Sequence, residues 1–403
     1  MREAETIRTS LPDPPARWIG RDDEVRNLNR TRREFMGAAG AALAAWPAVA
    51  QGYQQSSGGL VVREAEPRNL EYRFETLKDE VLNNSQFYVR NHFPQPRIDP
   101  ARWTLRVEGA VSRPFELSYA ELLRLPTDER LVLLECAGNN RAYLQPPAKG
   151  VQWGMGAVGV ANWSGVSLAR LLRRAGLRSS AVEVVLEGAD RGRPADAPVE
   201  ISYARGIPVT RAMDGTVLVA HAMNGAPLTG EHGAPARGLA PGWYGMASVK
   251  WLTRILVLDQ AFRGHFQTVD YTFWDQQDGL DVLRPLAEIQ PKAQIAQPIA
   301  GSRLSAGSRV RVHGAAWTGQ GTIERVQVSA DGGRTWSPAR LAGTAREYTW
   351  QFWEWDWRPI SRGGATLMAR ATDSRGREQP LTRDARRKNY MITHVVGVPV
   401  EVV

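Results

Sequence analysis

Cys136 is the only cysteine in this chain of 403 residues. The chain therefore cannot form an intrachain disulfide, and it cannot build a four-cysteine site for zinc or an iron–sulfur cluster. Three roles remain open for a single thiol. It can be a small buried hydrophobe, a nucleophile, or one soft ligand to a metal.

The residues around Cys136 predict its local structure. Residues 130–135 (Arg-Leu-Val-Leu-Leu-Glu) read as a buried strand, and residues 138–140 (Gly-Asn-Asn) read as a turn. Cys136 is therefore expected at a strand end, where folds place reactive groups. Glu135 is expected on the opposite face of the strand. Taken alone, this spacing favours a buried, inert thiol.

Composition limits the classes of protein that fit. Hydrophobic residues make up 43% of the chain and charged residues 23%, as in soluble globular proteins of two domains. The net charge of +9 would suit nucleic acid, a membrane surface, or an enzyme that attracts a small dianion. No zinc-finger or helix-turn-helix pattern and no basic run with interleaved aromatics occurs, which disfavours nucleic acid.

The first fifty residues resemble an export signal. Thr31-Arg-Arg-Glu-Phe-Met36 is a twin-arginine signature, an apolar stretch covers 37–46, and Ala48-Val-Ala50 suits cleavage. The apolar stretch is shorter than the ~20 residues that span a bilayer, so no membrane span is expected. A chance Arg-Arg pair before an alanine-rich helix is the alternative. We expect residues 1–50 to direct a folded protein to the periplasm.

The rest of the chain predicts a linker and two domains of an α+β protein. Residues 51–70 look like a linker, 71–290 form a mixed α/β domain, and 291–403 form a β domain. The first domain should contain strands at 102–108 and 182–187. It should also contain helices at 118–126, opened by a capping box of Ser118 and Glu121, and at 166–176, ended by a glycine.

The C-terminal residues alternate apolar and polar side chains. Residues 308–314, 323–329 and 366–372 follow this pattern, and turns such as Asp331-Gly-Gly333 separate the segments. Strands at this spacing without helices predict an antiparallel β-sandwich.

Several separated blocks resemble the sulfite oxidase family of molybdenum enzymes. They are residues 134–141 (Leu-Glu-Cys-Ala-Gly-Asn-Asn-Arg), 153–157 and 162–168, and the resemblance extends over about residues 70 to 400. It implies a molybdopterin-binding domain in which Cys136 gives its thiolate to molybdenum and the pterin dithiolene gives two more sulfurs. A soft thiolate suits that metal.

Segments 314–319 and 329–336 resemble the family's immunoglobulin-like dimerisation domain. The resemblance therefore implies that the C-terminal β domain is immunoglobulin-like. It also implies a homodimer formed through residues 291–403.

The resemblance also assigns substrate residues. It implies that Arg90 faces the substrate, and Arg141, five residues after the cysteine, is placed for the same task. A guanidinium can hold two oxygens of an oxyanion at once, and two arginines without a nearby carboxylate favour a dianion. Trp153 is expected to wall the pocket. Tyr271 is expected to point its hydroxyl toward the oxygen ligands of the metal, although a core tyrosine is the alternative.

The pterin-binding residues follow from the same resemblance. The resemblance implies that Tyr88, Asn91 and His92 contact the pterin and that Asp190 bonds its ring. The loops over 224–237 and 245–251 are rich in glycine, as expected where a backbone approaches a ligand closely. For each loop residue alone an ordinary surface loop is the stronger alternative. We carry over four residues to cradle the phosphate: His232, Arg237, Ser248 and Lys250.

The sequence departs from the family pattern in three ways. Neither a His-Pro-Gly-Gly nor a Cys-x-x-Cys-His haem signature occurs, so no haem is expected in this chain. Ala247-Ser248 replaces an Arg-His pair in the pterin loop. The family's third substrate arginine has no clear counterpart, and the nearest cations are Arg386, Arg387 and Lys388.

The sequence therefore predicts a periplasmic molybdenum oxidoreductase that oxidises sulfite and passes electrons to an external cytochrome c. Alternatives of the same fold are a dehydrogenase for another sulfur compound with a cytochrome subunit, or a nitrate or sulfoxide reductase. A molybdenum-free periplasmic binding protein and an immunoglobulin-like adhesion protein are alternatives of other classes, although the latter leaves the cysteine block unexplained.

Overall fold

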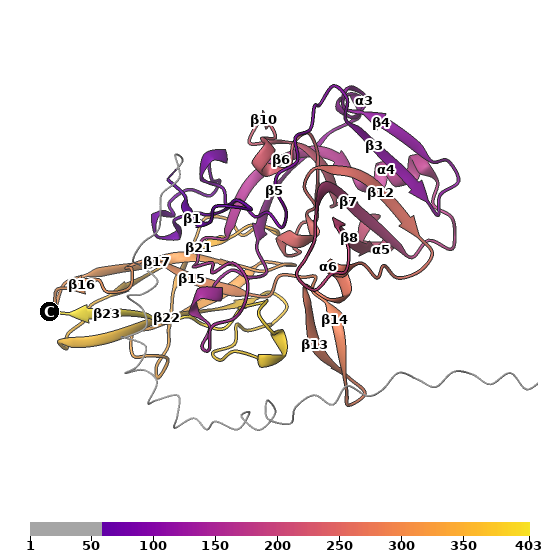
Figure 1. Cartoon of the computed structure of the whole chain (residues 1–403). Coiled ribbons are helices and arrows are strands. Elements are labelled where there is room, and N and C mark those ends of the chain that lie inside the picture. The colour runs from indigo at the N-terminus through magenta and orange to yellow at the C-terminus, as the bar shows by residue number, and fades with distance from the viewer. Residues whose placement is uncertain (1–58) are drawn as a thin grey trace, which may run out of the picture. The chain divides into compact units, whose positions relative to one another are not determined.

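The computed structural model describes residues 59–403 (Figure 1). The predicted twin-arginine segment and its cleavage site lie outside these residues. No helix within the described part of the chain is long and apolar enough to cross a membrane.

Two five-stranded sheets form the larger domain. The first sheet has the order β10-β9-β6-β5, with β11 pairing β9, and the second has the order β4-β3-β12-β7-β8. The strands of the first sheet are β5 (Asp128–Glu135), β6 (Val158–Ser167), β9 (Leu218–Met223), β10 (Ala226–Pro227) and β11 (Arg237–Leu239). Those of the second sheet are β3 (Thr104–Gly109), β4 (Phe115–Ser118), β7 (Glu183–Gly192), β8 (Ile201–Pro208) and β12 (Leu252–Leu258).

Short helices connect these strands, and both predicted helices are present, each shorter than predicted. The short helices are α3 (Tyr119–Arg124), α4 (Leu168–Ala175), α5 (Val209–Ala212) and α6 (His265–Thr268). The predicted capping box is confirmed, since the Ser118 side chain accepts from the Glu121 amide and Glu121 bonds the Ser118 amide. The predicted glycine stop is also confirmed, because Gly176 caps α4 with a φ of 69°.

The predicted linker is too long. Strands β1 (Val61–Glu64) and β2 (Asn69–Glu71) pair as an antiparallel hairpin within it. Leu60 and Leu70 are buried in the main core. The glycine- and serine-rich composition of residues 51–59 concealed the apolar residues that follow, so the linker prediction is wrong from residue 60 onward.

The C-terminal domain is built almost entirely of strands, as predicted. One sheet has the order β15-β17-β21-β20 and the other β16-β23-β22-β18-β19. The first sheet contains β15 (Lys292–Gln297), β17 (Val310–Trp317), β20 (Arg340–Ala342) and β21 (Gln351–Trp357). The second contains β16 (Arg303–Leu304), β18 (Ile323–Ser329), β19 (Ser337–Pro338), β22 (Gly363–Asp373) and β23 (Val398–Val402). Buried side chains from both sheets, including Val312, Val326 and Leu367, share one core.

A separate hairpin joins the two domains along the chain. Its strands are β13 (Thr272–Gln277) and β14 (Leu280–Pro285), which pair only with each other (Figure 1). The hairpin begins directly after Tyr271, a residue with the left-handed φ of 49°. A non-glycine residue in that conformation is uncommon, and its surroundings must hold it there.

Candidate active site

Cys136 lies directly after β5, and its turn is tied to the neighbouring strand. Its amide donates to the Ala157 carbonyl at 2.9 Å, and its own carbonyl accepts from the Asn139 amide at 2.9 Å. Cys136 is 6% exposed. The thiol therefore sits at a strand end, as predicted, in a turn with little freedom to move.

Two pockets meet at Cys136. One is lined by residues of the predicted pterin site, and the other, of about 230 Å³, lies toward the C-terminal segment. Arg90, Cys136 and Tyr271 line both pockets. A group bound in the first pocket can thus reach the thiol, and a small molecule in the second pocket can approach the same point.

Arg141 is fixed over the second pocket by backbone carbonyls. Its Nε donates to the Asn389 carbonyl at 3.1 Å and its Nη1 to the Val151 carbonyl at 2.8 Å. Gly138 makes room for it, because a Cβ there would lie 2.3 Å from Nη2. The guanidinium is buried without an ion pair to any described carboxylate, so its charge is available to an anion.

Arg90 is the second guanidinium at this point, and it is partly buried. It donates to the Asn91 carbonyl, and its Nη1 lies 3.4 Å from the Asn69 Oδ1. Like Arg141, it forms no ion pair within residues 59–403. A buried cation and a partly buried cation that both lack an ion-pair partner are stabilised when an anion binds between them, so the geometry favours an oxyanion site.

His92 and Tyr271 form a hydrogen-bonded pair beside these cations. The His92 Nε2 and the Tyr271 hydroxyl lie 2.5 Å apart, and the Tyr203 ring stacks on His92 at 4.4 Å. Burial, with Arg90 and Lys250 nearby, holds the pKa of His92 well below its usual value, so the imidazole is neutral. Burial raises the pKa of Tyr271 to about 12, so its phenol keeps its proton at neutral pH.

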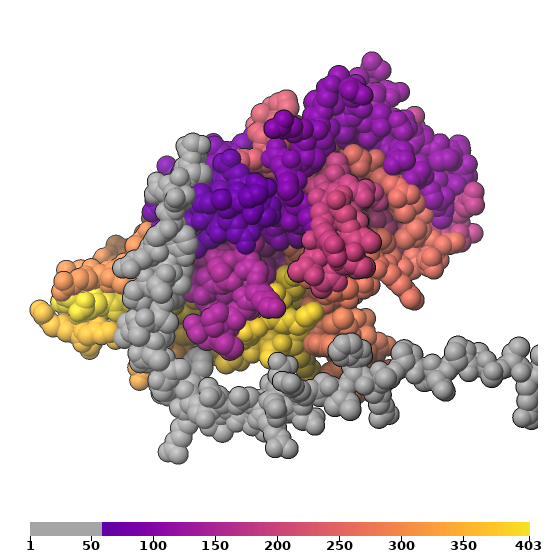
Figure 2. All heavy atoms as spheres, viewed as in Figure 1, coloured from indigo at the N-terminus to yellow at the C-terminus, as the bar shows by residue number. Residues whose placement is uncertain are grey.

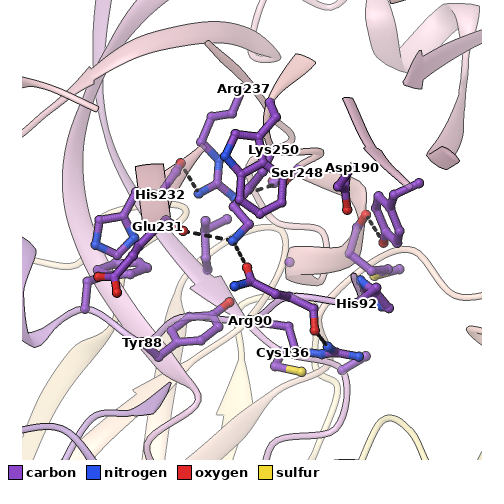
Figure 3. Close-up of a pocket in the computed structure, with 18 of the residues that line it drawn as sticks. Tyr88, Arg90, His92, Cys136, Asp190, Glu231, His232, Arg237, Ser248 and Lys250 are labelled. Atoms are coloured by element: carbon purple, nitrogen blue, oxygen red, sulfur yellow. Dashed lines mark hydrogen bonds between the residues drawn. The ribbon is translucent and has the colours of Figure 1, made fainter. Parts of the chain in front are cut away.

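The far end of the first pocket gathers the residues predicted to hold the phosphate (Figure 3). Arg237, Ser248 and Lys250 lie there, while Cys136 and Arg90 lie at the opposite end. Arg237 donates to the carbonyls of His232 at 3.0 Å and Ser248 at 2.9 Å. Lys250 donates to the Glu231 carbonyl at 2.8 Å and to the Asn91 side chain.

Burial lowers the pKa of the basic side chains at this far end of the first pocket. It lowers the pKa of Arg237 to about 10 and that of Lys250 well below its usual value, and Arg237 lowers that of Lys250 further. It also lowers the pKa of His232 to about 4, so that imidazole is neutral. The His232 Nε2 lies 3.0 Å from the Asn84 carbonyl and acts as its donor. A bound phosphate would raise the pKa of Arg237 and of Lys250 and so favour their charged forms.

Two buried polar atoms lining the first pocket have no hydrogen-bond partner among residues 59–403. They are the Arg237 Nε and the Asp190 Oδ1. Burial raises the pKa of Asp190 to about 7, although Lys250 and Arg90 oppose the shift. Unpaired buried polar atoms are costly, and these two supply a donor for a phosphate and an acceptor for a ring N–H. With a thiol at the other end, the residues fit a phosphorylated pterin that carries a soft metal.

The structure corrects two expectations about the second pocket. Trp153 does not line either pocket. It is fully buried and packs edge-on against Tyr88 at 6.4 Å, so it supports the wall from behind. The site also has a nearby carboxylate, contrary to prediction, because Asp270 lines the second pocket.

A tyrosine near the end of the chain, and none of the three cations just before it, lines the second pocket. Arg386, Arg387 and Lys388 line neither pocket, and Tyr390 lines the second one. The Tyr390 ring lies 4.8 Å from the Tyr271 ring and 5.4 Å from the Arg141 guanidinium. In Figure 2 the C-terminal segment adjoins the residues around 150, and the Asn389 side chain donates to the Lys149 carbonyl at 3.0 Å.

Sequence reasoning missed several lining residues. Lys149, Asn389 and Tyr390 line the second pocket, and Tyr203 and Glu231 line the first. Lys149 precedes a glycine in a proline-rich loop, which is a weak signal for a site. Tyr203 and Tyr390 gave no signal, since nothing near them in the sequence distinguishes them from core tyrosines.

No group of three or more His, Cys, Asp or Glu side chains in the part described could hold a metal ion by itself.

Comparisons with known proteins agree with this geometry. Residues 92–266 match the family model of the oxidoreductase molybdopterin binding domain, and residues 284–394 match the Mo-co oxidoreductase dimerisation domain. The sulfite oxidase of Gallus gallus is 36% identical over 343 residues, covering 80% of this chain and 73% of that protein. The mitochondrial sulfite oxidase of Rattus norvegicus is 34% identical over 343 residues, and the match spans 62% of its length.

More distant relatives share the fold and part of the sequence. A nitrate reductase of Ulva prolifera is 33% identical over 300 residues, covering 67% of this chain and 34% of that protein. The crystal structure of the sulfane dehydrogenase SoxCD from Paracoccus pantotrophus superposes with a TM-score of 0.73 at 25% identity, covering 94% of this chain and 92% of that one. The predicted resemblance is confirmed: the chain belongs to the sulfite oxidase family of molybdopterin-dependent oxidoreductases.

Proposed function

We propose that this protein is a periplasmic molybdenum oxidoreductase that oxidises sulfite to sulfate and passes the electrons to an external cytochrome c. The observation that carries the proposal is the pair of guanidiniums beside the single thiol, Arg141, which is buried, and Arg90, which is partly buried. Neither has an ion-pair partner within residues 59–403. Guanidiniums that no ion pair neutralises favour an anionic substrate over a neutral one.

The residues of the first pocket would hold the cofactor. Arg237, Ser248 and Lys250 would bind its phosphate, Asp190 would accept from its ring, and the Cys136 thiolate would be its protein ligand. The molybdenum cofactor, when bound, supplies the two-electron redox chemistry and the oxygen transfer that no side chain can perform.

The remaining residues would orient the substrate and control a proton. Arg90 and Arg141 would hold the oxyanion against the thiol end of the first pocket. Tyr271 stays protonated at neutral pH, so its hydroxyl can donate to an oxygen of the substrate or of the metal. Neutral His92 can accept that hydroxyl proton or share it, since the two atoms lie 2.5 Å apart.

One observation favours a sulfur compound other than sulfite as the substrate. The Tyr390 ring lies 5.4 Å from the Arg141 guanidinium in a pocket of about 230 Å³ that Lys149 also lines. Two tyrosine rings make one side of this pocket able to pack against a larger, less charged sulfur compound. The relative from Paracoccus is a sulfane dehydrogenase. Nitrate or sulfoxide reduction is the third candidate, since the arginines would hold any small oxyanion.

The test is to purify the chain from a molybdenum-replete host, then measure molybdenum and pterin and the sulfite-dependent reduction of cytochrome c. About one molybdenum per chain with rapid reduction supports sulfite oxidation. Molybdenum without sulfite activity contradicts sulfite as substrate and directs a panel to sulfane compounds, nitrate and sulfoxides. A folded protein without molybdenum overturns the enzyme proposal in favour of a periplasmic binding protein.

Location and assembly belong to the same proposal. We propose export by the twin-arginine route, which would carry the protein already loaded with its cofactor. The match to a dimerisation domain supports a homodimer formed through an immunoglobulin-like C-terminal domain. Fractionation of cells and light scattering of the purified protein test these two points.

A further inference from the structure

We propose that the buried pair Glu135–Lys292 is a positioning device that fixes the thiol of Cys136 from the C-terminal domain. The inference rests on the proposed function, because it takes Cys136 as the residue that must be held in place for a metal. Neither residue lines either pocket, so neither would touch a molecule bound there.

Two side chains of the C-terminal domain bind the two oxygens of the Glu135 carboxylate. The Lys292 Nζ, at the start of β15, lies 2.8 Å from Oε1, and the Trp317 Nε1, at the end of β17, donates to Oε2 at 2.9 Å. The side chains of Lys292 and Glu135 are only 1% and 2% exposed. A charge-assisted contact shielded from water is strong and geometrically specific.

The same carboxylate is tied to the turn that carries the thiol. The Asn139 side chain donates to the Glu135 Oε1 at 3.1 Å and accepts from the Ala157 amide at 3.1 Å. The Asn139 amide donates to the Cys136 carbonyl. Glu135 immediately precedes Cys136, so a shift of its side chain would move the backbone that carries the thiol.

A second contact from the same domain holds the other side of the turn. The Met391 amide donates to the Ala137 carbonyl at 2.8 Å. The Asn389 carbonyl accepts from the Arg141 Nε at 3.1 Å. The C-terminal domain therefore contacts the cysteine turn at Glu135 and at Ala137, on both sides of Cys136.

Stability alone does not explain a buried ion pair. Replacing such a pair by uncharged residues of similar volume is often neutral or stabilising, whereas removing one partner leaves an unpaired buried charge. A double variant can therefore remove the device while keeping the fold. The double variant therefore distinguishes a role of the pair in positioning Cys136 from a role in stabilising the fold.

The test uses the full chain with Glu135→Gln, Lys292→Met, and both together. We expect each single variant to lower the urea midpoint and the double variant to recover most of the loss. Cys136 is the only cysteine, so iodoacetamide reports on it alone. In the cofactor-free double variant, alkylation should be about tenfold faster than in the wild type, as expected for a tenfold shift in a local opening equilibrium.

Val326→Ala is the matched control, since Val326 is fully buried in the C-terminal core. It should lower the urea midpoint without changing the alkylation rate. In the loaded enzyme the double variant should lower kcat while leaving the KM for sulfite unchanged. A double variant that alkylates at the wild-type rate would overturn the inference. The alkylation needs no cofactor, so a wild type without molybdenum would overturn the proposed function independently of this result.

Discussion

At the scale of single residues, charge without a partner is the most informative property of the site. Arg141 donates only to backbone carbonyls, through Nε and Nη1, and its Nη2 has no partner in the protein that the structure describes. The guanidinium is thus held rigidly while part of it stays available for a ligand. This arrangement explains why the pocket favours an oxyanion and why lysine could not replace this arginine.

The variant Arg141→Lys should raise the KM for the anionic substrate about tenfold to a hundredfold. The ammonium keeps the charge but loses the planar fork, and each charge-assisted hydrogen bond contributes about 1.5–3 kcal/mol. Steady-state kinetics measure the effect. Exposed Arg386, changed to lysine, is the matched control and should leave the KM unchanged. An unchanged KM in the Arg141 variant would remove this residue from the substrate site.

His232 predicts a pH dependence of stability in the cofactor-free protein. Burial lowers its pKa from 6.5 to about 4, so the unfolded chain binds the proton more readily between those values. The contribution of the neutral, buried His232 to the free energy of unfolding is fully present above pH 6.5 and is lost as the pH falls toward 4. On acidification to about pH 5, proton binding by His232 in the unfolded chain should lower the free energy of unfolding by about 2 kcal/mol.

Urea unfolding at about pH 5 and about pH 8 tests this dependence. The variant His232→Gln should lose less stability on acidification than the wild type, because the titrating group is gone. Equal losses in the two proteins would mean that His232 does not titrate between these pH values.

At the scale of elements, the turn after β5 brings the thiol and the guanidinium together. Gly138 is required there, because a side chain would occupy the position of the Arg141 Nη2. The obstructing atoms belong to the end of a flexible side chain, so the fold can yield by moving the guanidinium. Gly138 is therefore needed for the position of the Arg141 guanidinium more than for the stability of the fold.

Gly138→Ala should leave the urea midpoint almost unchanged and raise the KM several-fold. Gly364→Ala is the matched control, since no heavy atom lies within 4 Å of the Cβ that it would add. Both variants are compared by urea unfolding and by kinetics. A Gly138 variant with native KM would show that Arg141 does not need its present position.

Much at this scale could be predicted from the sequence, because the signals are local. The strand before Cys136, the capping box at Ser118 and the stop at Gly176 each depend on a few neighbouring residues. Contacts between distant segments could not be predicted. Lys292 meets Glu135 across 157 positions, and no pattern near either residue indicates its partner.

At the scale of the whole molecule, the site is shared between the two domains. Strand β5 supplies the thiol, and the C-terminal segment supplies Tyr390 to the second pocket. The sequence indicated the pterin-side residues through the resemblance, and the first pocket gathers all of them. It did not indicate Tyr390, because the family pattern directed attention to the arginines just before it.

The variant Tyr390→Arg should favour sulfite over larger sulfur compounds. An arginine at this position adds a cation to those already lining the pocket, which increases the attraction for a dianion, and it removes the aromatic surface beside Tyr271. The ratio of kcat/KM for sulfite to that for a sulfane compound measures the effect, and we expect a rise of about tenfold. Tyr390→Phe keeps the ring and is the control. No change in the ratio for the arginine variant would exclude Tyr390 as a determinant of specificity.

The most direct test of the account is the number of sulfur neighbours of molybdenum, measured by X-ray absorption in the wild type and in Cys136→Ser. The account predicts three sulfurs in the wild type, one from Cys136 and two from the pterin. It predicts two in the variant, together with loss of turnover in a folded protein. An equal number of sulfurs in both proteins would contradict the role of Cys136 as the metal ligand.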